Sequence, residues 1–299
     1  MRPPDRRAPH ARAPAILARA AGPVAALARP ALIVHGGAGP VPDGERAPRQ
    51  AAVELARDAG WSLIGDGALA AVAAAVKQME DEPLLNAGIG ACLNLDGVVE
   101  LDAGVMQGGE LQAGGVAGLK DLRHPIDLAI AVMLDGRHVL LAGEGASRFA
   151  REHGIETCDP AIFITDRKRQ ELLLGADTVG AVARDADGRM AVAVSTGGIS
   201  GKLPGRIGDS PIPGSGFYAD DRFGAVCGTG QGEAFLRLAL ARLMVVELEH
   251  GMDAPAVATG AVALLGKRLN ALGGVIVIAR EGAPASSFNT PSMPVAVAT

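Results

Sequence analysis

The chain has 299 residues, of which 48% are hydrophobic and 20% charged, and its formal net charge is −5. This length corresponds to one large domain or two modest ones, and it buries a core without disulfide or metal staples. Aromatic residues make up only 3% of the chain. Together with the acidic balance, this argues against a nucleic-acid-binding protein, which needs stacking side chains and cationic contacts to phosphate.

Residues 1–30 differ in composition from the rest of the chain. Residues 1–30 are rich in Ala and Pro and carry six arginines against one acidic residue, Asp5. A secretory signal fits poorly because Arg19 interrupts the apolar stretch. We therefore predict a disordered extension over 1–30 and a single folded domain over 31–299.

Cysteine and histidine spacing gives no sign of a disulfide framework or a zinc site. Cys92, Cys158 and Cys227 form no CxxC pair, and the histidines show no HxxxH spacing. Reduced thiols are typical of a cytoplasmic protein. The longest uncharged apolar stretch, near 254–266, has about 13 residues and is too short to span a bilayer.

The first half of the chain is predicted to contain strands, a hairpin and helices before a polar connector. The pattern predicts a strand at 31–34, helices at 51–60 and 68–80, a hairpin of 91–94 with 98–106 around Asp96-Gly97, a strand at 116–119, a helix at 127–134, a strand at 138–142 and a helix at 146–153. The segment 158–177 is polar, has no clear period and is predicted to be an exposed connector, a common place for chain cleavage.

The second half opens abruptly on another hairpin. The pattern predicts strands at 178–184 and 190–195 around the turn 185–188, a Gly/Pro loop at 197–216, a strand at 224–227, helices at 232–249 and 254–272, and a strand at 274–279. Hairpin-linked strands in both halves, with helices segregated between them, predict an α+β fold. We expect two mainly antiparallel sheets packed together and covered by helices.

Two threonines of this second hairpin are candidate catalytic residues. A single Thr at the head of a strand, such as Thr178, is usually structural. Thr196, however, lies at the far end of the partner strand, followed by Gly197-Gly198. A tight turn would make Thr178 and Thr196 neighbours, with glycines leaving room beside them.

The loop after Thr196 carries an opposite-charge pair, Arg206 and Asp209. A surface ion pair, worth only about 0–1 kcal/mol, is the plainer interpretation. The functional interpretation is a clamp for a zwitterion, in which Arg206 grips an α-carboxylate and Asp209 accepts hydrogen bonds from an α-ammonium.

A glycine-rich turn, Gly228-Thr229-Gly230-Gln231-Gly232, runs from a strand into a helix. A phosphate cradle is one interpretation, but the turn lacks the Lys and the spacing of a P-loop. An oxyanion-binding turn, with the Thr229 hydroxyl and a backbone N–H directed at developing negative charge, fits equally well.

Several short sequence motifs match those of one family, in the same order along the chain. They are Ile33-Val34-His35-Gly36-Gly37-Ala38-Gly39, Asn86-Ala87-Gly88-Ile89-Gly90, Glu100-Leu101-Asp102-Ala103, Gly143-Glu144-Gly145-Ala146, 177–183, Ser195-Thr196-Gly197-Gly198, 203–211 and Phe288-Asn289-Thr290. Through them, residues 31–293 resemble the plant-type asparaginase / isoaspartyl peptidase family of N-terminal-nucleophile hydrolases. The resemblance implies a four-layer αββα sandwich. It also implies a precursor that cuts itself between Asp177 and Thr178, leaving an α chain to 177 and a β chain of 178–299.

The resemblance further implies release of L-aspartate from L-asparagine or from isoaspartyl peptides. The implied roles are nucleophile and base for Thr178, support of the nucleophile for Thr196, oxyanion stabilisation for Thr229, Gly230 and Asn86, and substrate binding for Arg206, Asp209, Gly230 and Gly232. No cofactor is required, and a structural sodium ion is implied. Its ligands would be the backbone carbonyls of Met79, Glu80, Glu82, Leu85, Ala87 and Ile89. A homodimer of αβ units is the corresponding assembly.

Some residues depart from the family pattern. Asp177 stands where asparaginase-type members often have Gly, and an Asp at this position is similar to the pattern of the related glycosylasparaginases. The segment that begins at His35, in contrast, favours the asparaginase branch. Pro291-Ser292 replaces the Glu-Gly that commonly follows Phe-Asn-Thr. Two alternatives therefore stay open: a glycosylasparaginase-type hydrolase, and an uncleaved amino-acid-binding homologue that has lost catalysis.

Overall fold

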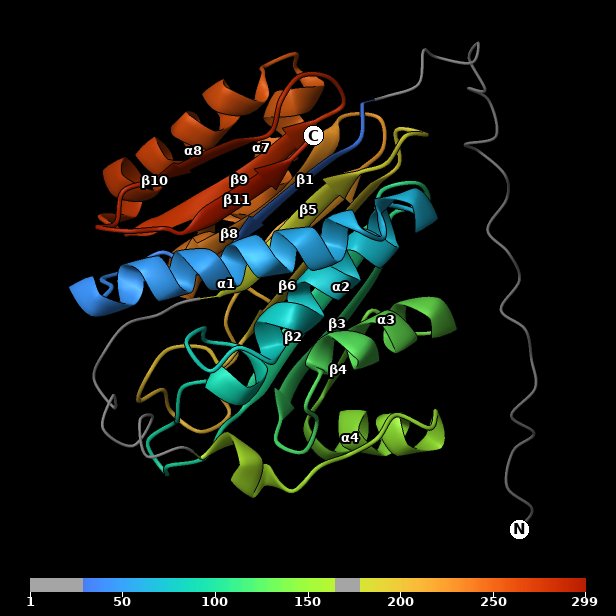
Figure 1. The fold of residues 1–299 in the computed structure, drawn as a ribbon, viewed down its shortest axis with the longest axis vertical. Helices are drawn as coiled ribbons and strands as arrows, with labels where there is room; N and C mark the ends of the chain where they lie inside the picture. Colours follow the sequence, from blue (N-terminus) through green and yellow to red (C-terminus); the bar gives the residue numbers. More distant parts are fainter. Residues whose placement is uncertain (1–28, 165–177) are drawn as a thin grey trace.

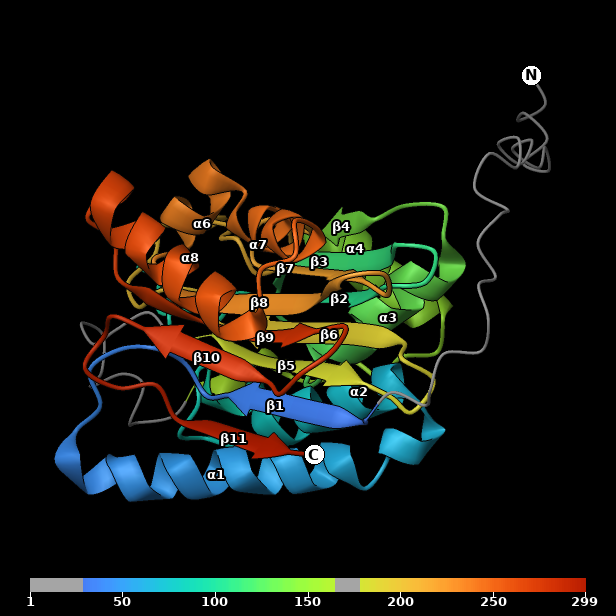
Figure 2. The same cartoon turned by 90° about the horizontal axis from the view of Figure 1, so that it is seen from above.

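The computed structural model describes residues 29–164 and 178–299. Asp177, most of the predicted connector 158–177 and nearly all of the predicted extension 1–30 lie outside the described residues. The rest forms four layers, two β-sheets face to face with helices on both outer faces (Figures 1 and 2). The predicted αββα sandwich is therefore confirmed.

The larger sheet has seven strands and unites distant parts of the chain. Its order is β11 (Val295–Ala298), β1 (Ala31–His35), β5 (Val179–Arg184), β6 (Met190–Thr196), β2 (Leu101–Gln107), β3 (Gln112–Leu119) and β4 (Leu140–Ala142). Every neighbouring pair is antiparallel except β3 and β4. The predicted hairpin β5–β6 lies at the centre of this sheet.

The smaller sheet has four antiparallel strands. Its order is β10 (Ala285–Phe288), β9 (Gly273–Ala279), β8 (Gly224–Gly230) and β7 (Phe217–Asp220). Its inner face packs on the inner face of the larger sheet. The core between them includes Ile33 and Val194 from the larger sheet and Cys227 and Ile276 from the smaller one.

Helices cover the outer face of each sheet. The larger sheet is covered by α1 (Asp43–Trp61), α2 (Ala68–Glu80), α3 (Pro125–Asp135) and α4 (Gly143–Glu152), and the smaller one by α6 (Gly232–Leu238), α7 (Leu240–Glu249) and α8 (Ala254–Leu269). Short 3₁₀ turns are η1 (Ile64–Asp66), η2 (Gly88–Gly90) and η3 (Pro160–Phe163).

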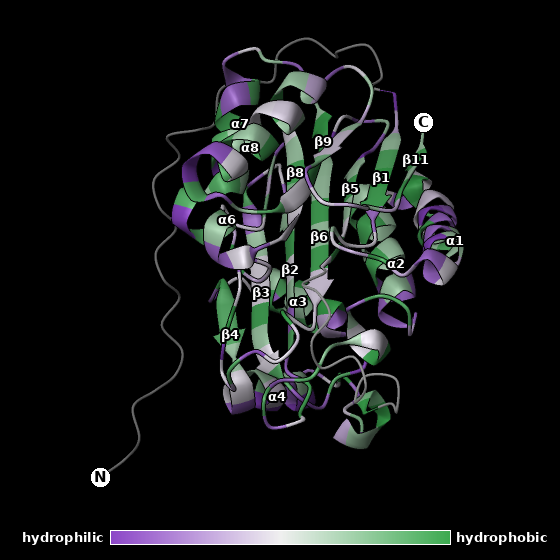
Figure 3. Ribbon diagram, turned by 90° about the vertical axis from the view of Figure 1, so that its left-hand side faces the viewer, coloured by the Kyte–Doolittle hydropathy of each residue, from purple (hydrophilic) through white to green (hydrophobic). Residues whose placement is uncertain are grey.

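Alternation along the strands explains how the layers are held. On β1, Leu32 and Val34 face the helices, whereas Ile33 faces the other sheet, as the two-residue period of a strand requires. All three side chains are almost completely buried. Accordingly, the strands are the most hydrophobic part of the molecule, and hydrophilic residues gather on exposed parts of the helices (Figure 3).

Three local predictions need correction, and three short strands were missed. The hairpin around Asp96-Gly97 is only a bridge between Leu93 and Val99, because the Asn94 side chain accepts the N–H groups of the turn and takes the place of a strand ladder. The helix predicted over 232–249 is two helices. The helix predicted over 254–272 ends at Leu269, before Asn270 in the left-handed region. The short strands β7, β10 and β11 were not predicted.

Candidate active site

The ends of β5 and β6 bring the two candidate threonines together. Val179 pairs with Ser195 across the two strands, which places Thr178 and Thr196 side by side at the strand ends. The Thr178 hydroxyl donates to Thr196 Oγ1 at 3.2 Å, and both residues are buried. The expected proximity of these threonines is confirmed.

Two further hydroxyls reach Thr178 from elsewhere in the chain. Thr229, on β8 of the smaller sheet, accepts the Thr178 N–H at 3.0 Å. Ser210 Oγ lies 3.2 Å from Thr178 Oγ1 and is almost fully buried. Because the single hydroxyl hydrogen of Thr178 goes to Thr196, Ser210 must be the donor to Thr178. The residue analysis of the sequence missed Ser210, although it lies beside Asp209 in a motif already singled out.

A neutral imidazole and a neutral thiol lie beside β5, the strand that follows Thr178. Burial lowers the pKa of His35 to about 3, and its Nδ1 accepts the Gly37 N–H at 3.3 Å. Cys227 Sγ lies 3.5 Å from His35 Nε2, and burial raises the pKa of this thiol. A side chain on Gly180 would stand 2.5 Å from His35 Nε2, so glycine is needed there. Neither group is charged at neutral pH, so this pair acts through packing.

Arg206 is paired with Glu233 and not with Asp209. Its Nε donates to Glu233 Oε1 at 2.9 Å and its Nη2 donates to Oε2 at 2.8 Å. The ion pair between Arg206 and Asp209 that the sequence suggested is therefore corrected. The reason is geometric, because Glu233 stands at the start of α6 and meets the outer edge of the guanidinium, whereas Asp209 turns into the protein interior.

Asp209 is a buried carboxyl with unused hydrogen-bonding capacity. It is 5% exposed, and its Oδ2 has no hydrogen-bond partner among the described residues. Burial raises the pKa of Asp209 to about 7. A Cβ on Gly232 would stand 2.5 Å from Asp209 Oδ1 and 3.1 Å from Arg206 Nη2. A side chain at position 232 would therefore crowd both the Asp209 carboxyl and the Arg206 guanidinium, and glycine lets these two charged groups lie close to its backbone.

Asn86 contacts the glycines after Thr196, and Gly230 follows Thr229 in the chain. The Asn86 side chain donates to Gly198 O at 2.7 Å and accepts the Cys92 N–H at 2.8 Å, so it fixes the loop that follows Thr196. Gly230 has φ +125° and pairs with Gly273, where a side chain would strike the backbone of that neighbour. Gly230 can therefore contribute only its backbone next to Thr229.

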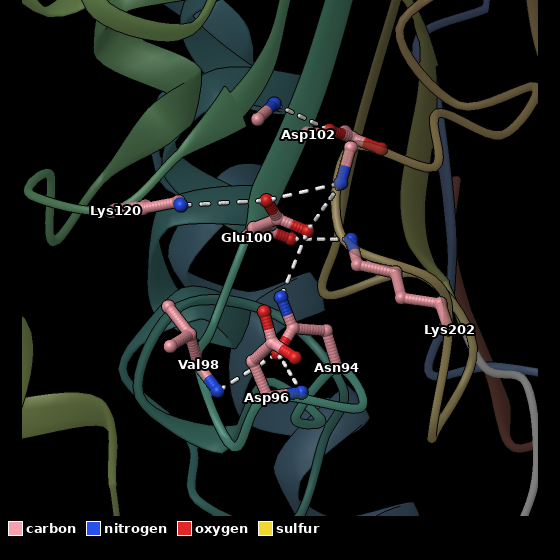
Figure 4. A network of polar contacts seen from close by, with 9 residues as sticks. Asn94, Asp96, Val98, Glu100, Asp102, Lys120 and Lys202 are labelled. Carbon is pink, nitrogen blue, oxygen red and sulfur yellow. Dashed lines mark hydrogen bonds and ion pairs between the residues drawn. The ribbon is translucent and has the colours of Figure 1, made fainter.

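A buried polar network supports the loop that carries Arg206 (Figure 4). The Glu100 carboxylate accepts the Gly205 N–H at 3.1 and 3.2 Å and the Asn94 side-chain amide at 3.1 Å. Lys202 Nζ donates to the Glu100 carbonyl at 2.7 Å. Burial raises the pKa of Glu100, but the hydrogen bonds from Gly205 and Asn94 outweigh it and leave that pKa below its ordinary value. A charged Glu100 therefore anchors the residue before Arg206.

A second carboxyl of this network, Asp102, is almost fully buried. Its Oδ1 accepts the Gly118 N–H at 2.9 Å. Burial raises the pKa of Asp102, and the charges of Lys202 and Arg206 oppose that rise. Sequence reasoning found none of Glu100, Asp102 and Lys202 as supporting residues, because their partners are distant in the chain.

In the loop after α2, backbone carbonyls pack closely against Gly88 and Gly90. A Cβ on Gly90 would strike Leu85 O and stand 2.7 Å from Glu82 O, and one on Gly88 would strike Glu80 O. The Glu80 side chain points away, toward the Ile126 N–H at 3.2 Å. Among the described residues, no group of three or more His, Cys, Asp or Glu side chains is placed to hold a metal.

No helix in residues 29–164 and 178–299 has both the length and the apolar character needed to cross a membrane. Cys92, Cys158 and Cys227, which all lie in the described residues, are not joined by disulfides.

Comparison with known proteins now agrees with this geometry. A family model described as Asparaginase matches residues 28–176 and 174–299. The isoaspartyl peptidase/L-asparaginase of Danio rerio is 39% identical, covering 88% of this chain and 90% of the relative. That of Xenopus laevis is 38% identical, with 89% and 91% covered, and that of Homo sapiens is 38% identical, with 90% and 93% covered. The chain therefore belongs to the asparaginase family of N-terminal-nucleophile hydrolases.

Proposed function

We propose that this protein is an autoprocessed amidohydrolase that releases L-aspartate from L-asparagine and from isoaspartyl peptides. The observation that carries the proposal is the hydroxyl cluster on Thr178, contacted by Thr196, Ser210 and Thr229. Asp209 precedes Ser210 in the chain, and Asp209 and Arg206 both lie close to Gly232. The relatives named isoaspartyl peptidase/L-asparaginase support the same substrates.

The mechanism begins when the chain is cut between Asp177 and Thr178. The freed α-amine of Thr178, with a pKa of about 8, takes the proton from its own Oγ1. Oγ1 attacks the side-chain carbonyl carbon of the substrate, and negative charge develops on the carbonyl oxygen. Thr229, the backbone at Gly230 and Asn86 stabilise that oxyanion. The leaving ammonia or amine takes the proton, and the aspartyl group remains on Oγ1 as an ester.

Water then attacks the ester. The Thr178 amine accepts one proton of the water, and Oγ1 regains a proton as L-aspartate leaves. Arg206 holds the α-carboxylate throughout and Asp209 holds the α-ammonium. All these groups are supplied by the chain, so the reaction needs no organic cofactor.

A sodium ion is proposed in the loop 79–89. The backbone carbonyls that would hold it are those of Met79, Glu80, Glu82, Leu85, Ala87 and Ile89. When bound, the ion would stabilise the loop that carries Asn86. Replacing sodium by a bulky organic cation in the buffer should then lower the melting temperature, and an unchanged melting temperature would contradict the site.

We also propose a homodimer of αβ units in the cytoplasm, without nucleic-acid or membrane partners. The resemblance supports the assembly, and three cysteines that are not joined by disulfides in the described residues are consistent with a reducing compartment.

Mass spectrometry combined with product assays tests the proposed function. Purified protein should yield a fragment that begins at Thr178, and it should release ammonia from asparagine and aspartate from β-aspartyl dipeptides. Thr178→Ala should stay uncut and inactive. Intact protein after long incubation, with neither product, would sink the proposal. Aspartate binding without turnover would then favour the amino-acid-binding alternative.

A preference for glycosylated asparagine over β-aspartyl dipeptides would favour the glycosylasparaginase alternative. Asp177 is the residue that keeps this alternative open, and the segment that begins at His35 is the one that opposes it.

A further inference from the structure

Glu233 holds one edge of the guanidinium that is proposed to bind the substrate. The carboxylate meets Nε and Nη2 of Arg206 at 2.9 and 2.8 Å, in the parallel two-bond geometry that fixes an arginine plane. The Arg206 side chain is 14% exposed, whereas that of Glu233 is 58% exposed. Glu233 therefore approaches from the solvent side.

The opposite edge of the guanidinium faces glycines. A Cβ on Gly208 would stand 2.8 Å from Arg206 Nη1, and one on Gly198 would stand 3.3 Å from it. A Cβ on Gly232 would stand 3.1 Å from Arg206 Nη2 and 2.5 Å from Asp209 Oδ1. A side chain on Gly208 or Gly198 would therefore crowd Nη1, and the two glycines keep this edge of the guanidinium clear of side chains of their own.

From this division we propose that Glu233 is a positioning residue that fixes Arg206 so that its Nη1 edge meets the α-carboxylate of the substrate. The inference rests on the proposed function. A free arginine side chain samples many rotamers, and Glu233 removes part of that freedom before the substrate arrives. The enzyme thereby gains selectivity for substrates with a free α-carboxylate.

The opposite role would be competition, with Glu233 occupying Arg206 until a substrate displaces it. The geometry argues against this, because Glu233 uses the Nε edge and leaves Nη1 uncovered. The two roles predict opposite changes in affinity. Positioning predicts weaker binding when Glu233 is removed, and competition predicts tighter binding.

The experiment compares Glu233→Ala and Glu233→Gln with the wild type on two substrates. One is a β-aspartyl dipeptide. The other is the same dipeptide in which the α-carboxylate of the β-aspartyl residue is converted to a carboxamide. For the acid, Glu233→Ala should raise KM about tenfold and leave kcat within about twofold, and Glu233→Gln should be intermediate. The carboxamide does not use Arg206 fully, so the preference for the acid should shrink about tenfold. The cut fraction of each variant is measured by mass spectrometry.

Glu144→Gln is the matched control. Glu144 is an exposed glutamate in the first turn of α4, and it pairs with Arg151 of the same helix at 2.6 Å. It should change neither KM nor the preference. Calorimetry with L-aspartate gives a readout without turnover, and its affinity should fall about tenfold in Glu233→Ala.

An equal loss on both substrates, or tighter aspartate binding by the variants, would overturn the inference. Wild-type protein that turns over neither substrate would defeat the proposed function instead, and calorimetry would still decide the role of Glu233. Wild-type protein that does not bind aspartate would defeat the inference as well.

Discussion

At the scale of single residues, the proposed nucleophile Thr178 is contacted by the hydroxyls of Thr196, Ser210 and Thr229. Thr196 Oγ1 accepts from Thr178 and from the Gly198 N–H at 2.9 Å. Ser210 then supplies the donor on the other side of Thr178 Oγ1. A donated hydrogen bond favours the oxygen when it carries negative charge. Ser210 should therefore assist the step in which Thr178 loses its proton.

Ser210→Ala is expected to lower kcat about tenfold, because the nucleophile loses one hydrogen-bond donor. Ser210→Thr keeps the hydroxyl and should recover most of the activity. Ser62→Ala, which removes an exposed hydroxyl bonded to Ala59 O, is the control. Steady-state rates per cut protein measure the effect. Full activity in Ser210→Ala would show that Thr196 alone supports Thr178.

The pH dependence of substrate binding should report Asp209. Burial raises its pKa from 3.8 to about 7, so the carboxyl is neutral below that pH and charged above it. A substrate ammonium prefers the charged form. The affinity for aspartate should thus rise with pH up to about 7 and weaken by up to about tenfold for each pH unit below it.

Inhibition by aspartate, measured from about pH 5 to about pH 9, checks this expectation without involving the proton transfers of catalysis. Asp209→Asn has the same shape but no ionisation, so its inhibition constant should be high and flat across that range. If the variant keeps the wild-type pH profile, the titration belongs to another group.

At the scale of elements, the break between α6 and α7 is a feature that helical periodicity could not predict. Ala239 adopts φ +47°, and the first N–H groups of α7 bond to the preceding loop, Ala241 N to Ser215 O at 3.2 Å and Arg242 N to Gly214 O at 2.9 Å. This loop follows Ser210. Restarting the helix there satisfies backbone donors and ties α7 to the loop that carries the site.

The break makes a signed prediction about stability. A left-handed alanine costs about 1–2 kcal/mol, and glycine loses about 0.4–1 kcal/mol through its more flexible unfolded chain. Ala239→Gly should therefore raise the free energy of unfolding by about 0.5 kcal/mol. Ala263→Gly, at an exposed position inside α8, should lower it by about 1 kcal/mol. Denaturant midpoints at unchanged slope measure both, and changes of the same sign would refute the assignment.

At the scale of the whole molecule, the sequence predicted what local patterns encode. The central hairpin β5–β6 and the layered αββα arrangement followed from alternation, turn residues and the resemblance. The strand β11 did not, since it has only four residues and its partner β1 begins 264 positions earlier. The contact of Arg206 with Glu233 spans 27 residues and depends on how α6 meets the loop. Such pairings are set by tertiary packing, which no local pattern records.

The strand order also decides how a cut chain behaves. β1 belongs to the segment before Asp177 and lies between β11 and β5, which both belong to the segment after it. Likewise, β6 from the second segment pairs with β2 from the first. The two fragments share one sheet and its cores, so separating them requires breaking the ladders on both sides of β1 and exposing buried apolar surface.

After cleavage, the two fragments should therefore co-elute in gel filtration and separate only in denaturant. Unfolding of the cut protein releases two chains from each unit, whereas uncut Thr178→Ala releases one. By mass action, the unfolding midpoint of the cut protein should rise more steeply with protein concentration than that of the uncut variant. Calorimetric scans of both proteins over a range of concentrations measure the difference. Equal slopes, or fragments that part in native buffer, would mean that the shared sheet does not hold the two chains together.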